Sequence, residues 1–156
     1  MFFFGALYSV INRTLELDVN QILGSIFNNE SDLSELIIDL NTQGQLFDKG
    51  IDSEGALLSD IGGNYSDITI AMKRTEGLPF NRVTLYDSGA FYDSFYVKYD
   101  GSGLVIDADT IKEGIDLQDR WGANIIGLTD ESRGKLMFFL IPLIVEYALD
   151  YMVQDL

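Results

Sequence analysis

The chain has 156 residues, enough to bury about 69% of the surface that its extended form exposes and so to build its own core. With 47% hydrophobic residues and no cysteine or histidine, it excludes intrinsic disorder, disulfide frameworks, Cys/His zinc sites and Ser-His-Asp chemistry. Its 25 acids against 10 bases give a net charge of −15, which repels nucleic acid and anionic membranes. We therefore expect one domain over residues 1–156 that binds no nucleic acid directly and uses no cofactor. The charge either only keeps an apolar chain soluble or selects a basic partner surface.

Both ends of the chain are apolar. Residues 1–12 include three consecutive phenylalanines, Phe2, Phe3 and Phe4. They lack the basic leader of a signal peptide, because the first cation is Arg13 and no small-x-small cleavage site follows. Near the other end, the unbroken apolar run over residues 137–145 is nine residues long, against the roughly 20 that a membrane span needs. We therefore expect a protein made in the cytoplasm that does not enter a membrane and whose apolar ends contact other subunits.

Two helices are predicted in the first third of the chain. Apolar side chains recur every three or four residues over 19–28 and again over 33–47, which is the spacing of one helix face. Asp18 is placed to cap the first helix, and either Ser31 or Asp32, each paired with the polar side chain three residues on, to cap the second.

A glycine-rich connector separates these helices from the centre of the chain. Four glycines within residues 48–65 predict an irregular segment, and residues 69–73 fit either a short helix or a strand. A turn signal, Glu76-Gly77-Leu78-Pro79, follows.

Three of the ten cations gather around this turn. Lys73, Arg74 and Arg82 form a locally basic segment on an acidic protein, which indicates a contact point for a partner. Ion pairs with nearby acids of the same chain are the alternative.

The centre of the chain has the strongest strand character. Residues 82–86 are rich in β-forming side chains, and residues 87–89 break the pattern with a turn. Residues 95–100 alternate between apolar and polar, and after the turn at 100–103 residues 104–108 return. We expect an antiparallel hairpin at the heart of a small sheet.

A long helix is predicted at the C-terminal end, after a short helical segment over 115–121. Thr129 is placed to cap a helix over 130–153, whose middle is apolar on every side. Packing this helix against a single layer therefore leaves apolar surface exposed. The candidate contact residues on it are Phe138, Phe139 and Ile141.

Patterns for catalysis and ligand binding fail on spacing. Residues 127–135 place six residues between two glycines where a phosphate loop needs four. Residues 48–59 lack the oxygen ligand and the glycine that a calcium loop needs at its third and sixth positions. Asp107 and Asp109 share a strand face, but among 25 acids some pair is always close. The sequence therefore predicts no enzyme and no metal site.

Two short segments carry a family resemblance. The segment from Arg82 to Phe95, with Asp87-Ser88-Gly89 at its centre, resembles the Asp-Thr-Gly-x-Leu-x-x-Ser-Ile segment of the virion morphogenesis proteins of tailed phages. These are the tail-completion or head-tail joining proteins of Mu-like and lambda-like phages. The segment over residues 126–131 resembles their Leu-Gly-Leu-Ser-x-Glu segment, which likewise opens a long C-terminal helix.

The residues that carry this resemblance have structural roles in the turn and the core, whatever the family. Asp87 or Ser88 is placed to accept amides of the turn, Gly89 allows a tight backbone path, and the aromatic side chains anchor the turn. The motif residues are Asp87, Ser88, Gly89, Phe91, Ser94, Phe95, Gly127 and Leu128.

The resemblance implies a small α+β subunit that joins the head to the tail, or completes the tail, by assembling into a ring. Its partners would be copies of itself and other neck, portal or tail proteins, and its place would be the virion, assembled in the host cytoplasm. The alternative is a cytoplasmic interaction module or dimer of non-phage type. The expected fold is a small antiparallel sheet with a central hairpin, packed against N-terminal helices and a long C-terminal helix.

Overall fold

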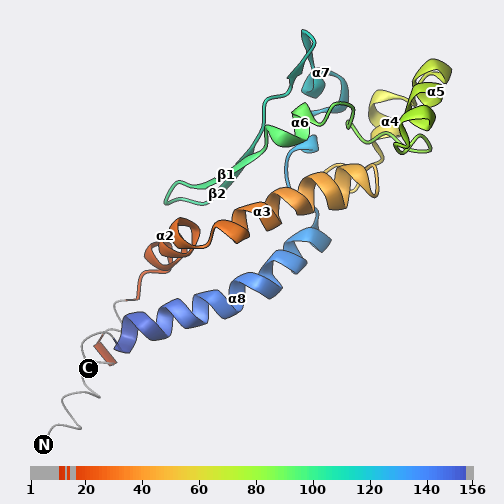
Figure 1. The fold of residues 1–156 in the computed structure, drawn as a ribbon. Helices are drawn as coiled ribbons and strands as arrows, with labels where there is room; N and C mark the ends of the chain where they lie inside the picture. The colour runs from red at the N-terminus through yellow and green to blue at the C-terminus, as the bar shows by residue number, and fades with distance from the viewer. Residues whose placement is uncertain (1–10, 13, 15–16, 154–156) are drawn as a thin grey trace, which may run out of the picture.

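The computed structural model describes residues 11–12, 14 and 17–153, so Phe2, Phe3 and Phe4 lie outside the described residues. The molecule has the predicted α+β class, and its strands form two small antiparallel pairs. Its shape is elongated. Figure 1 shows three layers along much of its length: α8, then α2 and α3, then the β1–β2 hairpin. The elements are α2 (Val19–Asn29), α3 (Ser31–Asp39), η1 (Leu40–Phe47), α4 (Leu58–Gly62), α5 (Asp67–Glu76), α6 (Ala90–Asp93), β1 (Tyr96–Tyr99), β2 (Leu104–Asp107), β3 (Ile111–Lys112), β4 (Ile115–Asp116), α7 (Leu117–Trp121), η2 (Ala123–Ile125) and α8 (Asp130–Val153).

The N-terminal helices begin where the sequence predicts. Asp18 caps α2 by accepting the backbone N–H of Asn20 at 2.9 Å. The caps predicted for α3 are wrong: no described side chain caps it, and the Ser31 hydroxyl donates to the neighbouring Asp32 carboxylate at 3.3 Å instead. From Leu40 the same helix continues as the π-helix η1, in which the polar side chains Asn41, Thr42 and Gln45 are buried.

The described residues form two hydrophobic cores. One lies between α2, α3 and α8, and the other lies among α4, α6, α7 and the segment that precedes α6. The first core contains Ile22, Ile26, Leu33, Ile37, Leu128, Leu136 and Leu140. The second contains Leu46, Leu58, Val83, Leu85, Phe91, Phe95, Leu117 and Ile125. The π-helix η1 joins them, since Leu40 packs against the first core while Leu46 belongs to the second.

The predicted hairpin is present as β1 and β2, joined by the turn at 100–103. Along β1, Val97 and Tyr99 are half-buried while Tyr96 and Lys98 are exposed, as the alternation predicts. The Tyr99 ring stacks on Phe27 with centroids 5.7 Å apart, and its hydroxyl donates to Asn20 at 2.9 Å. These contacts fix the hairpin over α2.

Residues 82–86, which the structure describes in full, form no strand, and the sequence prediction for them is wrong. The backbone turns at Leu85, whose φ of +59° is incompatible with a strand. Side chains take the place of a neighbouring strand: Thr84 N–H donates to the Tyr65 hydroxyl at 2.9 Å, and the Tyr92 hydroxyl donates to the Thr84 carbonyl at 2.6 Å. A β-forming sequence pairs only where the fold places a strand beside it.

Candidate interaction surface

The first motif segment forms a tight turn followed by α6. Gly89 has a φ of +91°, which residues with a Cβ rarely adopt, and the Ser88 hydroxyl accepts the Ala90 N–H at 3.4 Å. Asp87 makes a different contact from the one expected, because its carboxylate accepts a hydrogen bond from Lys112 at 2.8 Å. That hydrogen bond and the charge of Lys112 lower the pKa of Asp87.

The aromatic side chains of this segment anchor it in the second core, as predicted. Phe91 and Phe95 are buried, with ring centroids 5.1 Å apart. The Ser94 hydroxyl donates to the Phe91 carbonyl at 2.7 Å and accepts the Asp109 N–H at 3.0 Å. The motif side chains from Asp87 to Phe95 therefore stabilise the turn, contribute to the second core and bond the segment that follows the hairpin.

Buried amides of η1 hold the second motif segment. Asn41 donates to the Ile125 carbonyl at 3.2 Å and accepts the Gly127 N–H at 2.7 Å. One turn further on, Gln45 donates to the Gly127 carbonyl at 2.9 Å and accepts the Thr129 N–H at 2.8 Å. The sequence analysis missed both amides, although polar residues within an apolar helical stripe are a signal for such contacts.

The start of α8 follows directly. Leu128 is buried in the first core, and Thr129 caps the helix by accepting the Ser132 N–H at 3.2 Å, as predicted. Gly127 and Leu128 therefore connect the buried amides of η1 to the start of α8 and set the position and direction of that helix.

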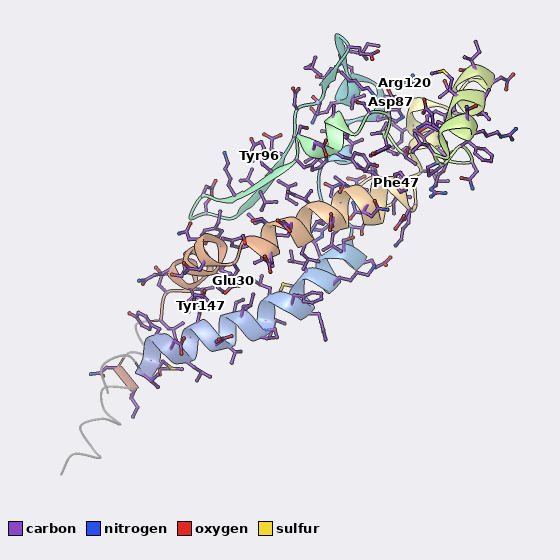
Figure 2. The ribbon with its side chains drawn as sticks, in the orientation of Figure 1. Glu30, Phe47, Asp87, Tyr96, Arg120 and Tyr147 are labelled. Carbon is purple, nitrogen blue, oxygen red and sulfur yellow. The ribbon has the colours of Figure 1, made fainter. Side chains whose placement is uncertain are left out.

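One face of α8 packs against α2 and α3. Leu136 and Leu140 are buried there, and Tyr147 donates its hydroxyl to the Glu30 carboxylate at 3.2 Å. Figure 2 shows Tyr147 and Glu30 on facing elements, near the junction of α2 and α3. Burial of the hydroxyl, and after it this hydrogen bond, raises the pKa of Tyr147.

The opposite face of α8 is apolar and has no partner among the described residues. It comprises residues spaced three or four apart and each at least 51% exposed, which we call the α8 face: Phe138, Ile141, Val145, Leu149 and Val153. Phe138 is 76% exposed, and its ring meets Phe139, itself 53% exposed, at a centroid distance of 5.6 Å. The three contact residues predicted on this helix are therefore all at the surface.

A groove runs beside this face. It lies between α3 and α8, has a volume of about 340 Å³, and its floor is made by Leu33, Leu36, Phe139 and Leu143. Glu30 and Asp32 stand at its rim. A partner that fills this groove must therefore offer apolar side chains and tolerate an acidic border.

The C-terminal helical segment has the length and composition of a membrane span. The stretch Ala123–Val153 is long and apolar enough to cross a bilayer, and only 11% of its most apolar 18 residues is buried. The sequence estimate from the nine-residue run was too short, because the charged side chains Glu146 and Asp150 interrupt the apolar stretch without ending it. Helices of this length and composition also occur in the cores of proteins that enter no membrane.

The three cations predicted as a contact point have different environments. Lys73 is buried, with its ammonium donating to the Tyr86 carbonyl at 2.5 Å, so its assignment to an outer contact surface is wrong. Arg82 is half-buried and donates to the Phe47 carbonyl at 2.7 Å. Arg74 remains exposed, with its guanidinium 4.5 Å from the centre of the Phe80 ring.

A second exposed apolar face lies on α5. Ile68 is 75% exposed and Met72 is 57% exposed, and their spacing of four residues places them on one side of the helix, which we call the α5 face. The same end of the molecule carries further exposed hydrophobic side chains, Leu57, Ile61 and Phe80. The α5 face could not be predicted from the sequence, because two apolar residues in a helix of this length do not establish a periodic pattern.

Among the described residues, no acidic side chains form a group of three or more that could hold a metal ion. Comparisons of the chain with protein-family models, with curated proteins and with solved structures find no match. The features of the described residues that bear on function are therefore the exposed apolar faces of α8 and α5.

Proposed function

We propose that the chain is a non-enzymatic structural subunit of a tailed-phage virion that joins the head to the tail, or completes the tail, by assembling into a ring with copies of itself. One observation carries this proposal: the α8 face, which includes Phe138 and Val145, is exposed along an apolar helix of 24 residues. Such a helix is about 36 Å long. Exposed apolar surface on this scale is typical of an interface with another protein.

The two motif segments support the same proposal. The segment from Asp87 to Phe95 builds the second core, and Gly127 and Leu128 set the course of α8. These roles are structural and would serve any family with this fold, so the phage assignment itself comes from the resemblance of the two segments to virion morphogenesis proteins. Gly127 and Leu128 directly precede α8, the helix that carries the contact residues Phe138, Phe139 and Ile141.

Native mass spectrometry of the purified chain tests the proposal. We expect a closed oligomer, with a mass that is a fixed multiple of 17.5 kDa, together with ring-shaped particles in electron micrographs. Binding to portal, neck or tail-tube proteins encoded near its gene would place it in a virion. A monodisperse monomer that binds none of them would contradict the proposal.

The same measurement distinguishes the proposed function from the alternative one. A cytoplasmic interaction module of non-phage type that uses the α8 face symmetrically would give a dimer and no ring, because a two-fold contact closes at two copies. A dimer that ignores neck and tail proteins would favour that alternative.

A further inference from the structure

We infer that the groove between α3 and α8 binds an amphipathic helix of another protein, with apolar side chains of that helix in the groove and its lysines or arginines at the acidic rim. The occupant is not a copy of this chain, and the site is not the α8 face. The groove is therefore a second contact surface, separate from the one in the proposed function.

The floor of the groove is apolar and only partly covered. Phe139 is 53% exposed, Leu36 and Leu143 are half-buried, and Leu33 is buried in the first core. The volume of about 340 Å³ lies at the small end of ligand sites, which measure roughly 300–1,000 Å³. The groove therefore accommodates a few anchor side chains of a protein whose other residues lie on the surface around it.

One helix forms each wall of the groove. Leu33 and Leu36 come from α3, and Phe139 and Leu143 come from α8, which lies beside α3 in Figure 1. The apolar side chains on each wall are three or four residues apart, so they form a strip parallel to the two helices. A third helix places its own apolar side chains into such a strip at the same spacing. An apolar helix face is therefore the element that fits.

Acidic side chains border the groove on the α3 side. Glu30 and Asp32 line it. Asp32 and Asp39 lie four residues before and three residues after Leu36, so helix spacing places both on the same side of α3 as Leu36. Glu30 accepts the hydroxyl of Tyr147 at 3.2 Å, which fixes its carboxylate between the two walls (Figure 2). A partner in the groove therefore meets negative charge on this side.

The α8 wall continues the acidic border. Glu146 is exposed three residues after Leu143, on the same side of the helix. Burial and the hydrogen bond to Glu30 raise the pKa of Tyr147, and the negative charge of Glu146 raises it further, so both carboxylates lie near one hydroxyl. Carboxylates on both walls favour a cationic partner.

The walls of the groove carry no positive charge of their own. Residues 19–47 and 136–153, which include both walls, contain no lysine or arginine. Lys135, four residues before Phe139, is paired with Glu131 at 2.8 Å. A helix that carries lysine or arginine beside its apolar face is therefore attracted to the groove, whereas a second copy, with a net charge of −15, is repelled.

The groove and the α8 face lie on different sides of α8. Val145, in the middle of the α8 face, is two residues after Leu143. Because successive residues of a helix are about 100° apart, Val145 lies on nearly the opposite side of α8 from Leu143. Contacts between copies through the α8 face and a helix bound in the groove therefore use different surfaces.

Two synthetic peptides of about 18 residues, long enough to form a helix, test the inference. Both carry leucines at helical spacing on one face and glutamines on the other. The positions beside the leucines are lysine in one peptide and glutamate in the other. Fluorescence anisotropy of the labelled peptides measures their binding to the unmodified chain. We expect the lysine peptide to bind at least tenfold more tightly than the glutamate peptide. Equal binding of both peptides, or binding of neither, overturns the inference.

A rim variant tests the acidic border. It carries Asp32→Asn and Glu146→Gln, and we expect it to bind the lysine peptide at least fivefold more weakly than the unmodified chain does. The matched control variant carries Asp67→Asn and Glu76→Gln, which remove the same two charges from exposed positions of α5, away from the groove (Figure 1). We expect the control to bind like the unmodified chain. Equal weakening in both variants would mean that the peptide responds to net charge alone, which overturns the inference.

Phe139→Gln tests the apolar floor. Glutamine removes the aromatic contact, keeps helix propensity and adds no charge, and we expect at least tenfold weaker binding of the lysine peptide. The control is Ile115→Gln on β4, where the side chain is 62% exposed and binding should not change. Unchanged binding in Phe139→Gln overturns the inference. Circular dichroism reports whether each variant keeps its helices, and if Phe139→Gln loses helix, the rim variant decides.

Native mass spectrometry of the rim variant distinguishes the groove from self-association. We expect the rim variant to have the same oligomeric state as the unmodified chain. A different oligomeric state would identify the groove as a contact between copies, which overturns this inference and leaves the proposed function intact. An unmodified chain that is monomeric and still binds the lysine peptide in its groove would overturn the proposed function and support this inference.

Discussion

Asn41 and Gly127 lie 86 residues apart in the sequence and are joined by a hydrogen bond in which the Gly127 N–H donates to the Asn41 side-chain oxygen at 2.7 Å. The same amide donates through its nitrogen to the Ile125 carbonyl. Asn41 is fully buried, and the oxygen and the nitrogen of its side chain each have a hydrogen-bond partner within the protein. This side chain thus ties η1 to the start of α8 and fixes the angle at which α8 leaves the second core.

Asn41→Ala is expected to destabilise the protein strongly. The substitution leaves the Gly127 N–H and the Ile125 carbonyl without a partner, at a cost of roughly 1–3 kcal/mol for each unsatisfied group. Urea unfolding should therefore show a loss of about 2–4 kcal/mol in the free energy of unfolding. The matched control is Gln43→Ala in the same helix, where the exposed amide bonds only Asp48 and the expected change is below about 0.5 kcal/mol. Equal effects at the two positions would show that the buried amide is unimportant.

Leu140 and Phe138 should separate folding from assembly. Leu140 is 8% exposed in the first core, so Leu140→Ala is expected to cost about 2–5 kcal/mol of stability in a urea titration. Phe138 is 76% exposed, so Phe138→Ala should change the stability of the dissociated subunit by less than about 0.5 kcal/mol while it weakens self-association in analytical ultracentrifugation. A large loss of subunit stability in Phe138→Ala would mean that its ring is covered within one copy.

Glu131 makes part of the stability dependent on pH. Its carboxylate accepts hydrogen bonds from Lys135 at 2.8 Å and from Lys49 at 2.6 Å, and these hold the pKa of Glu131 at about 2, below the ordinary 4.5. A pKa lowered by folding stabilises the protein above the unfolded pKa and ceases to do so as pH falls through the folded value. The urea midpoint of the unmodified chain should therefore exceed that of Glu131→Gln above about pH 4.5, and the difference should vanish toward about pH 2.

Salt provides the control for this prediction. Both lysine side chains are roughly half exposed, so about 1 M salt, at which the Debye length is about 3 Å, should shrink the difference at neutral pH. A difference that is independent of both pH and salt would show that the contact is not ionic.

Two helical glycines should respond in opposite directions to alanine. A Cβ at Gly62 would lie 2.2 Å from Nε1 of Trp121, so Gly62→Ala is expected to cost about 1–3 kcal/mol by overpacking. A Cβ at Gly134, inside α8, would meet nothing within 4 Å, so Gly134→Ala is expected to stabilise the protein by about 0.5–1 kcal/mol. Thermal unfolding of both variants measures the two shifts, and the same sign for both would contradict the structure around Trp121.

Vesicle flotation tests whether the α8 face meets lipid. We expect the unmodified chain to remain unbound with zwitterionic vesicles, because insertion of α8 would carry the charged side chains Glu146 and Asp150, and the acid-bearing α2 and α3 beside them, into an apolar medium. Flotation that Phe138→Gln abolishes would identify the face as a membrane-docking surface and would contradict a protein partner.

The local elements of the fold were largely predictable, and the candidate surface was predictable in part. The apolar spacing of 19–28, the alternation along Val97 and Tyr99, and the cap at Thr129 all act over a few residues, so they are legible in one stretch of sequence. The exposure of Phe138 followed from a helix that is apolar on every side, since one neighbouring layer can cover only one face.

Features that depend on a neighbour far away in the chain could not be predicted from the sequence. Residues 82–86 have β propensity, but Tyr65 and Tyr92 occupy the place of a pairing strand. Lys73 has the sequence context of a surface cation, but in the structure it is buried and its ammonium donates to the Tyr86 carbonyl.

Periodicity and capping act locally, so the helices at the two ends of the chain, the hairpin and the surplus of apolar surface on α8 could be predicted from one stretch of sequence at a time. That Asn41 bonds the segment leading into α8, and that α5 and α8 lie apart, depends on packing between residues far apart in the chain, so neither could be predicted from the sequence.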